Sequence, residues 1–332
     1  MKPEISLIIA TFNRCGPLNK LLNILKEQTL AKDKWDIIVA VDGSRDETER
    51  MLEKWIAGNS LPLTWFCQEN AGQCVARHNA ILKSKSDKII IIDDDLNPCP
   101  AFIASHLRAL DDDGKTVVIG KVVPTENWKE RPLYEIVREY KTTDIHHNFE
   151  IGIVKPKGED LVTQNVSFYK KFYLDVGGFD SEMRLGEDTL LGSNFERGGA
   201  NFIFCKEAWA IHESNIGSYE TWIKRQYDYG KYAWLAWKKT DENIYFHPLK
   251  NFCTGSKLNR WAILLFVRSD AVTKLMVSFF RWFGMFLRKI NLLTMAIATH
   301  KAIISLKQHQ GLKDVYGSWS AFKNAEKVYK SK

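Results

Sequence analysis

The sequence predicts an α/β fold in which a mostly parallel sheet is flanked by helices and followed by a helical C-terminal region. In the first part of the chain, short apolar segments alternate with single amphipathic segments of about 10–15 residues, which is typical of β-α-β units. The last third lacks this alternation and is instead basic and rich in aromatic side chains.

The regular first part predicts four strands separated by helices. Each strand is a short apolar run that suits burial on both faces of a sheet. The strands are expected at Ile5–Ala10, Trp35–Val41, Leu63–Cys67 and Lys88–Ile92. The helices between them are expected from Pro17, at Asp46–Trp55 and at Val75–Leu82.

The middle of the chain is less regular. It predicts a strand at Thr116–Val123, a helix at Arg131–Tyr140, an extended segment at Leu161–Tyr169, a helix from Gly186 to about Glu196 and an aromatic helix at Tyr219–Trp237. We therefore expect an α/β domain over residues 1–215, which would hold any ligand site at its strand ends, and a basic, aromatic-rich helical region over 216–332.

Charge is distributed unevenly along the chain. The 332 residues carry a net charge of +7, but residues 211–332 hold 20 basic and 8 acidic side chains (net +12), whereas residues 1–210 hold 27 and 32 (net −5). This asymmetry suggests two different roles on one chain.

Composition and chain start also exclude several classes. The six cysteines form no CxxC pair, which argues against a zinc site or a disulfide framework and favours a reducing cytoplasm. The first residues indicate a strand and not a secretory signal. No run of about 18 apolar residues predicts a transmembrane helix.

Polar side chains follow each of the four predicted strands: Thr11, Asp42, Asn70 and Asp93–Asp95. In such sheets ligands bind at the carboxyl ends of the strands. The three adjacent carboxylates repel one another, and a divalent cation that also binds phosphate would relieve this. The alternative is a solvated acidic turn; the position directly after a buried strand favours the metal.

Two further positions carry possible chemistry. Glu187 and Asp188 open a predicted helix, where capping alone would explain them, but a carboxylate near the cation site can also act as a general base. His212 follows the apolar stretch 208–211 and is either a structural histidine or a second metal or pyrophosphate contact.

A set of short motifs runs in order from Thr11 to about Lys231. They are TFNR (11–14), VDGS (41–44), ENAGQCVARHNA (69–80), DDD (93–95), QNVSF (164–168), GGFD (177–180), GED (186–188) and RQYDYGK (225–231). This ordered set closely resembles family 2 glycosyltransferases over about two thirds of the chain. His78 is one departure, because that family more often has ARN there.

The resemblance implies a GT-A, Rossmann-like fold and inverting transfer of a sugar from a nucleotide-sugar donor, with UDP favoured, assisted by Mn²⁺ or Mg²⁺. It implies a glycan or lipid-linked acceptor. We expect no nucleic-acid partner, because no recognition motif for nucleic acid accompanies the basic charge. Asp188 is the expected base, with Glu187 beside it. The expected donor contacts are Thr11, Asn13, Arg14, Asp42, Arg77, Asp93 and Asp94; the metal ligands are Asp95, Asp93 and His212; the acceptor contacts are Asn165 and Glu187.

Two other functions compete with this reading. A sugar-phosphate nucleotidyltransferase would need a glycine-rich basic loop after the first strand, which TFNRCGP does not supply. A catalytically inactive, glycosyltransferase-like scaffold is disfavoured by the intact Asp95 and Asp188.

The basic C-terminal region predicts amphipathic helices. Between Trp261 and Leu306, apolar and aromatic runs are interrupted every several residues by Lys or Arg. One interpretation is an anionic membrane surface, with the protein peripheral at the inner face of the cell membrane. The other is packing on the catalytic core or on a second copy in a homo-oligomer.

Overall fold

The computed structural model describes residues 2–110, 113–213, 217–240, 247–254 and 257–331. The chain divides into two compact units. The first comprises Met1–Glu126 and Thr142–Ser214, and the second Asn127–Lys141 and Asn215–Lys332. The boundary that we predicted between residues 215 and 216 falls outside the described residues. Asn127–Lys141, which we assigned to the first domain, belongs to the second unit.

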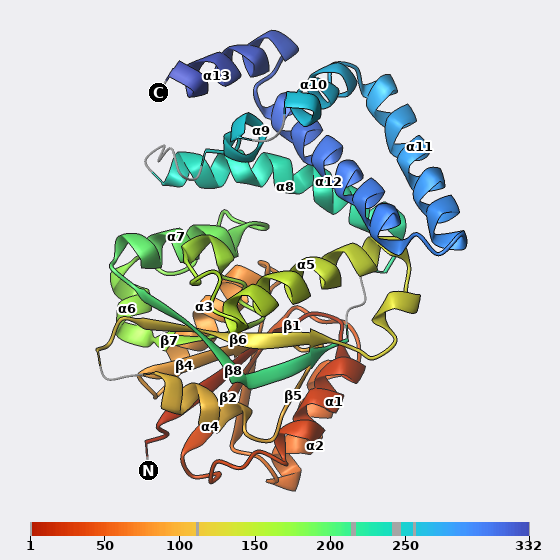
Figure 1. The fold of residues 1–332 in the computed structure, drawn as a ribbon. Helices are drawn as coiled ribbons and strands as arrows, with labels where there is room; N and C mark the ends of the chain where they lie inside the picture. Colours follow the sequence, from red (N-terminus) through yellow and green to blue (C-terminus); the bar gives the residue numbers. More distant parts are fainter. Residues whose placement is uncertain (1, 111–112, 214–216, 241–246, 255–256, 332) are drawn as a thin grey trace. The chain divides into compact units, whose positions relative to one another are not determined.

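The first unit is built on an eight-stranded mixed sheet with the order β3-β2-β1-β4-β7-β6-β8-β5 (Figure 1). Its first four strands are mutually parallel, β7 is antiparallel to β4 and β6, β8 is parallel to β6, and β5 is antiparallel to β8. The strands are β1 (Ile5–Thr11), β2 (Trp35–Asp42), β3 (Leu63–Gln68), β4 (Lys88–Ile92), β5 (Leu96–Pro98), β6 (Thr116–Pro124), β7 (Asn165–Tyr169) and β8 (Asn201–His212).

Helices of this unit cover both faces of the sheet. They are α1 (Cys15–Leu25), α2 (Thr48–Gly58), α3 (Gln73–Lys83), α4 (Phe102–Ala109), the short 3-10 turn η2 (Gly158–Asp160), α6 (Lys170–Asp175) and α7 (Glu187–Arg197). Helix α5 (Leu133–Glu150) begins in the second unit and ends in the first.

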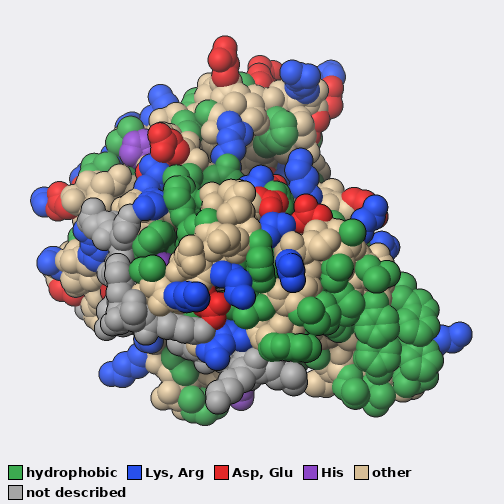
Figure 2. Space-filling view, turned by 90° about the horizontal axis from the view of Figure 1, so that it is seen from above, with side chains coloured by type: hydrophobic (Ala, Val, Ile, Leu, Met, Phe, Trp, Pro, Cys, Tyr) green, Lys and Arg blue, Asp and Glu red, His purple; other side chains and the backbone are tan. Residues whose placement is uncertain are grey.

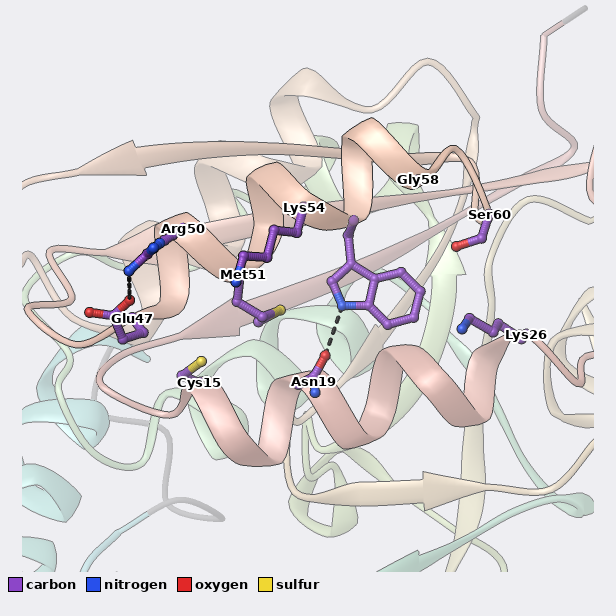
Figure 3. Close-up of a pocket in the computed structure, with 10 residues that line it drawn as sticks. Cys15, Asn19, Lys26, Glu47, Arg50, Met51, Lys54, Gly58 and Ser60 are labelled. Carbon is purple, nitrogen blue, oxygen red and sulfur yellow. Dashed lines mark hydrogen bonds and ion pairs between the residues drawn. The ribbon is translucent and has the colours of Figure 1, made fainter.

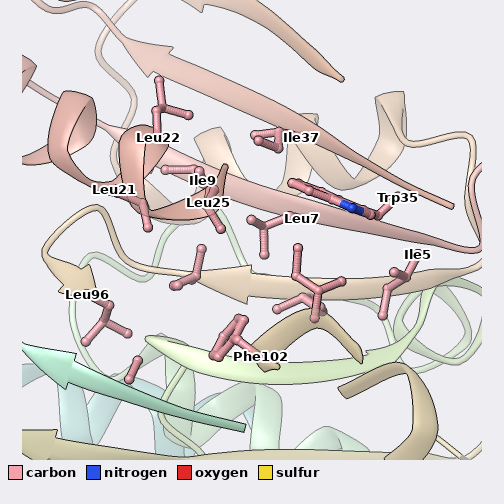
Figure 4. Close-up of a cluster of buried hydrophobic side chains, with 14 of the residues drawn as sticks. Ile5, Leu7, Ile9, Leu21, Leu22, Leu25, Trp35, Ile37, Leu96 and Phe102 are labelled. Carbon is pink, nitrogen blue, oxygen red and sulfur yellow. The ribbon is translucent and has the colours of Figure 1, made fainter. Parts of the chain in front are cut away.

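Alternate residues of each central strand pack on opposite faces. Ile5, Leu7 and Ile9 of β1 join the buried cluster beneath α1, α2 and α4 (Figure 4), whereas Ile8 joins the cluster beneath α3, α6 and α7. Both faces of the sheet are therefore buried, which explains why these strands are continuous apolar runs in the sequence.

The first four strands and the helices between them match the prediction to within a few residues, and the α/β fold class with its C-terminal helices is confirmed. The segment Leu161–Tyr169 is a strand only from Asn165. Strand β5, helix α4 and the first half of β8 were not predicted. The first half of β8 was not predicted because residues Asn201–Glu207 mix apolar and polar side chains without a regular alternation.

The described part of the second unit is helical. Its elements are η1 (Trp128–Glu130), α8 (Tyr219–Lys239), α9 (Lys250–Thr254), α10 (Lys257–Phe266), α11 (Asp270–Lys289), α12 (Leu293–Val315) and α13 (Trp319–Ser331). They share a core that includes Trp222, Val277, Leu287 and Phe322. Among the described helices, none combines the length and the apolar character needed to cross a bilayer.

Candidate active site

The carboxyl ends of three neighbouring parallel strands carry polar side chains. β1 ends at Thr11, β2 ends at Asp42, and Asp93–Asp95 follow β4 directly. Because β1 lies between β2 and β4, these positions share one edge of the sheet. This is the edge at which α/β sheets bind ligands.

Arg14 links two of the three carboxylates after β4. Its Nε lies 3.1 Å from Asp94 Oδ1, and its Nη2 lies 2.9 Å from Asp95 Oδ2. Thr11 Oγ1 donates to Asp94 Oδ2 at 2.7 Å. Burial raises the pKa of Asp94 to about 7, while Arg14 and Thr11 act in the opposite direction. The charge of Asp94 therefore depends on the cationic groups beside it.

The pairing of β5 with β8 places His212 beside Asp95. Leu96 pairs with His212, the last residue of β8, and the backbone N–H of Glu213 donates to the Asp95 carbonyl at 2.9 Å. His212 Nε2 consequently lies 3.8 Å from Asp95 Oδ2. Asp95 Oδ1 is buried and accepts no hydrogen bond from the described residues.

A single buried guanidinium joins the carboxylates after β4 to those that open α7. Arg77, in α3, is 4% exposed. Its Nη2 lies 2.5 Å from Asp93 Oδ1, and its Nη1 donates to Thr163 Oγ1 at 2.7 Å and lies 3.8 Å from Glu187 Oε1. Arg77 therefore contacts both acidic groups that we singled out in the sequence.

Helix α7 begins at the acidic pair. Gly186 precedes it with a φ of +74°, a conformation that glycine adopts without strain. Thr163 Oγ1 donates to Asp188 Oδ1 at 2.5 Å, and the side-chain amide of Gln73 donates to Glu187 Oε1. The pair is thus held by residues from α3 and from the segment before β7.

Burial makes both carboxylates of this pair harder to ionise. Burial and the adjacent Asp188 charge raise the pKa of Glu187 to about 7, and Arg77 opposes that rise. The pKa of Asp188 is also raised, chiefly by burial, against the effect of Arg77 and the Thr163 hydrogen bond. A carboxylate with a raised pKa is a stronger proton acceptor when it is ionised.

Asp42 binds the loop between β3 and α3. Its carboxylate accepts from the Gln68 amide at 2.8 Å and from the backbone N–H groups of Ala71 and Gly72 at 2.9 and 2.8 Å. Asp42 is 3% exposed. It therefore fixes the loop that leads into α3, the helix that carries Arg77.

Asn13 connects the loops that follow β1 and β2. Its backbone N–H donates to Ser44 Oγ at 2.9 Å, and its Oδ1 accepts from the backbone N–H of Arg45 at 2.7 Å. Asn13 has a φ of +51°, which asparagine tolerates better than most residues. The loop carrying Thr11 and Arg14 is thereby anchored to its neighbour.

No group of three or more His, Cys, Asp or Glu side chains that could hold a metal ion is found among the described residues. Asp95 and His212 form only a pair.

Comparison with known proteins agrees with this geometry. The family model described as "Glycosyl transferase family 2" matches residues 6–174, about half of the chain. The chain belongs to this family. The resemblance read from the motifs is confirmed, and the family comprises glycosyltransferases, a group of transferases in class EC 2.4.

One curated relative is validoxylamine A glucosyltransferase of Streptomyces hygroscopicus subsp. jinggangensis (strain 5008). It is 24% identical over 248 residues, which cover 65% of this chain and 58% of the relative. The chain spans about half the length of the first curated relatives that it matches, 58% and 54%.

Two solved structures share the fold over nearly the whole chain. Mannosyltransferase PcManGT from Pyrobaculum calidifontis, in complex with GDP-Man and Mn²⁺, has a TM-score of 0.62 at 15% identity and covers 95% of this chain and 88% of its own. S. aureus TarS 1-349, in complex with UDP, has a TM-score of 0.52 at 15% identity and covers 96% and 92%. The fold of this family 2 member is therefore GT-A.

Asn165, which we predicted as an acceptor contact, is buried within the sheet. It is 1% exposed; its amide nitrogen donates to the carbonyls of Lys121 and Ala208 at 3.1 and 3.0 Å, and its Oδ1 lies 2.8 Å from His106 Nε2. A Cβ on Gly120 would lie 2.3 Å from that Oδ1. These bonds join β6, β7 and β8 and give Asn165 a structural role in the sheet, while its role as an acceptor contact stays a prediction.

Three residues of the site were missed in the sequence. Thr163 connects Arg77 to Asp188, Gln73 holds Glu187, and Gln68 holds Asp42. Thr163 and Gln68 lie beside motif residues, but single polar residues carry no spacing signal. Gln73 lies within the ENAGQCVARHNA motif and could have been found there.

A separate pocket of about 560 Å³ lies between α1 and α2 (Figure 3). Its lining includes Asn19, Lys54 and Trp55, and Trp55 Nε1 donates to Asn19 Oδ1 at 2.8 Å. None of the predicted site residues lines it. We do not assign it to the chemistry of this family 2 member.

Proposed function

We propose that the protein transfers a sugar, with inversion, from a nucleotide-sugar donor to a hydroxyl group of a glycan or lipid-linked acceptor. The observation that carries this proposal is the arrangement around Arg77. Its guanidinium contacts Asp93, at the strand ends where we place the donor, and also contacts Glu187 directly. It reaches Asp188 through the hydroxyl of Thr163. Donor and base would thus lie within one continuous network.

The general base in this proposal is Asp188. Inverting transfer in one displacement needs a group that removes the proton of the acceptor hydroxyl as that oxygen attacks. Burial raises the pKa of Asp188, which makes its ionised form more basic. The hydroxyl of Thr163 donates to Oδ1 at 2.5 Å and so fixes the orientation of the Asp188 carboxylate.

Glu187 has a supporting role in this proposal. Its Oε1 accepts from Gln73 and lies 3.8 Å from Arg77 Nη1. Its raised pKa of about 7 allows it to be protonated near neutrality. A protonated Glu187 would place less negative charge beside Asp188 and could donate to a hydroxyl of the acceptor sugar.

The residues present fit a divalent cation held jointly by the protein and the donor. Asp95 Oδ1 is buried with no hydrogen-bond partner among the described residues, and His212 Nε2 lies 3.8 Å from the other oxygen. Carboxylate and imidazole together suit Mn²⁺, and Mg²⁺ is commonly bound through one or two carboxylates plus phosphate and water. When bound, such an ion would offset the charge that develops on the departing diphosphate.

The remaining donor-edge residues would bind and orient the nucleotide. This role stays a prediction for Thr11, Asn13, Arg14, Asp42, Asp93 and Asp94. Arg14 and Arg77 already neutralise the three aspartates, at 2.5–3.1 Å. Arg77 holds Asp93 Oδ1, so we propose Asp93 for the donor sugar or ribose more than for the metal. UDP is our preferred nucleotide, as in the TarS complex, whereas PcManGT was solved with GDP-Man.

A location at the cytoplasmic face of the membrane fits this reaction and the chain's chemistry. The six cysteines are scattered along the sequence without a CxxC pair, a pattern that favours a reducing compartment. Lipid-linked acceptors would be presented at a membrane surface.

A thermal-shift panel of nucleotide sugars, with and without Mn²⁺, tests the proposal. We expect a Mn²⁺-dependent stabilisation by one class of UDP-sugar, and slow hydrolysis of that donor in the absence of acceptor. A shift with GDP- or dTDP-sugars alone would overturn the UDP preference. Stabilisation without any turnover would favour an inactive scaffold.

A further inference from the structure

Helix α11 exposes a row of large apolar side chains along its outer face. Figure 2 shows hydrophobic side chains gathered into one area on the right, the side on which α11 lies in Figure 1. The exposed fractions run from 37% to 67%, for Val272, Leu275, Phe279, Trp282, Met285 and Phe286. Monomeric proteins rarely expose so many large apolar groups together without a binding role.

The opposite face of the same helix is buried in the second unit's own core. Val277 and Leu287 belong to that core, and Gly284 and Thr273 are buried beside them. Residues spaced by three, four and seven lie on one helical face, so Leu275, Phe279, Trp282 and Phe286 form a stripe distinct from the buried one. Packing within this unit therefore explains one stripe of α11 and leaves the other uncovered by it.

Aromatic rings on the outer stripe are already stacked on one another. The ring centres of Trp282 and Phe286 lie 6.1 Å apart and the two rings are nearly parallel. Phe279 stacks in the same way, at 5.8 Å, on Phe283, a half-buried ring that packs against the core of the unit. These rings are ordered by their neighbours along the helix, which lowers the entropy that binding would cost.

The charges that border the stripe on α11 are mainly positive. Lys274, Arg281 and Lys289 are exposed on α11, and no acidic residue occurs in the sequence between Asp270 and Asp314. Arg281 Cζ also lies 3.8 Å from the ring centre of Tyr219. The carboxylate of Glu220 also lies near Arg281, with Oε1 4.0 Å from Nη1. A surface that combines exposed aromatic groups with mainly basic charges is complementary to an apolar layer covered by anions.

We propose that α11 lies in the interface of a bilayer that contains anionic phospholipids, with its aromatic stripe among the acyl chains and its basic residues at the headgroups. The helix has 20 residues, about 30 Å at 1.5 Å per residue, and it does not qualify as a membrane span. It would therefore lie in the plane of the membrane. This inference rests on the second unit alone and is independent of the proposed reaction.

Flotation of the full chain with lipid vesicles tests the aromatic stripe. We expect binding to vesicles of phosphatidylcholine with about a third phosphatidylglycerol, and at least a tenfold loss in Trp282→Ser/Phe286→Ser. The matched control is Ile56→Ser/Leu82→Ser, which removes apolar groups that are 45% and 48% exposed in the first unit. No binding by the folded wild type, or equal loss in the control, would overturn the proposal.

Vesicle flotation also tests the basic residues of α11. Lys274→Gln/Lys289→Gln should weaken binding to anionic vesicles by at least threefold at low salt, and high salt should remove that difference. Lys54→Gln/Lys85→Gln, two exposed lysines of the first unit, is the matched control. Equal binding to vesicles of pure phosphatidylcholine at both salt concentrations would contradict the anionic requirement.

Tryptophan quenching by phospholipids brominated on the acyl chains locates the helix without a disruptive substitution. Trp282→Phe should remove most of the quenching, whereas Trp261→Phe, on α10 and 63% exposed, should leave it. The reverse result would overturn the assignment to α11. A wild-type dimer in solution that becomes monomeric in Trp282→Ser/Phe286→Ser would show instead that a second copy covers the stripe.

Discussion

The acidic pair at the start of α7 should lower the stability of the protein at neutral and alkaline pH. Glu187 is 4% exposed, and its pKa is raised to about 7 from an ordinary value of 4.5. The folded state therefore holds its proton more tightly than the unfolded state does. Replacing Glu187 by Gln removes this titration while keeping the size of the side chain and a partner for the Gln73 amide.

The sign and size of the effect follow from linkage. Below pH 4.5, Glu187 is protonated in both the folded and the unfolded state and does not change the free energy of unfolding. Above pH 7 it is ionised in both states, and the folded state is destabilised by the full cost of burying the charge. Stability is lost as pH rises between these values. The shift from 4.5 to about 7 corresponds to about 3 kcal/mol at pH 8, with most of it gone by pH 5. For a unit of this size that is roughly 6–12 °C in Tm.

The pH-dependent cost of Glu187 is measured by thermal unfolding of the wild type and Glu187→Gln at pH 5 and pH 8. We expect the Tm advantage of the variant to be several degrees larger at pH 8 than at pH 5. Glu53→Gln, an exposed glutamate on α2, is the control and should show no such pH dependence. An equal or smaller advantage at pH 8 would refute the argument that burial makes Glu187 costly to ionise.

The remaining predictions concern other parts of the same unit. Thr163→Val should lower kcat by about 10- to 100-fold with little change in the donor KM, because the charge-assisted hydrogen bond to Asp188 is worth ~1.5–3 kcal/mol. Steady-state kinetics measures both constants, and an unchanged kcat would contradict this role of Thr163. Gly120→Ala should destabilise the fold by roughly 1–3 kcal/mol in urea unfolding, because the new Cβ would lie 2.3 Å from Asn165 Oδ1; wild-type stability would show that the strands relax easily. His212→Ala should raise the Mn²⁺ concentration needed for half-maximal activity in a metal titration, and an unaltered titration would remove it from the metal site.

Much of the fold could be predicted because the first four strands are buried on both faces. Residues such as Ile8 and Ile90 lie in opposite clusters of one sheet, so each strand appears as an unbroken apolar run. Their carboxyl ends could then be placed at one edge from topology alone. Strand β5 has three residues and pairs with β8, which lies far along the chain, so local sequence could not indicate it.

The site was predicted at its acidic residues and missed at the groups that hold them. The sequence indicates the carboxylates through their clustering and motifs, but not that Arg77 is shared between Asp93 and Glu187, which is a tertiary contact. Thr163 is a further tertiary contact. For Asn165, a motif residue, the sequence did not indicate the hydrogen bonds that its amide donates to the carbonyls of Lys121 and Ala208.

The basic C-terminal region could be predicted as helical but not resolved into faces. Sequence periodicity indicated apolar stripes on amphipathic helices. The structure separates the stripe that α11 buries around Val277 and Leu287 from the one that exposes Leu275 and Trp282. Only the second is available to a partner.

The central claim is that Asp188 is the base of a sugar transfer whose donor is held elsewhere in the same network. It is tested most directly in Asp188→Asn, by measuring sugar transfer alongside calorimetric binding of the nucleotide sugar identified in the thermal-shift panel, with Mn²⁺ present. The account predicts a fall in transfer of about 10²- to 10⁴-fold with donor affinity unchanged. Near wild-type turnover in this variant would contradict it.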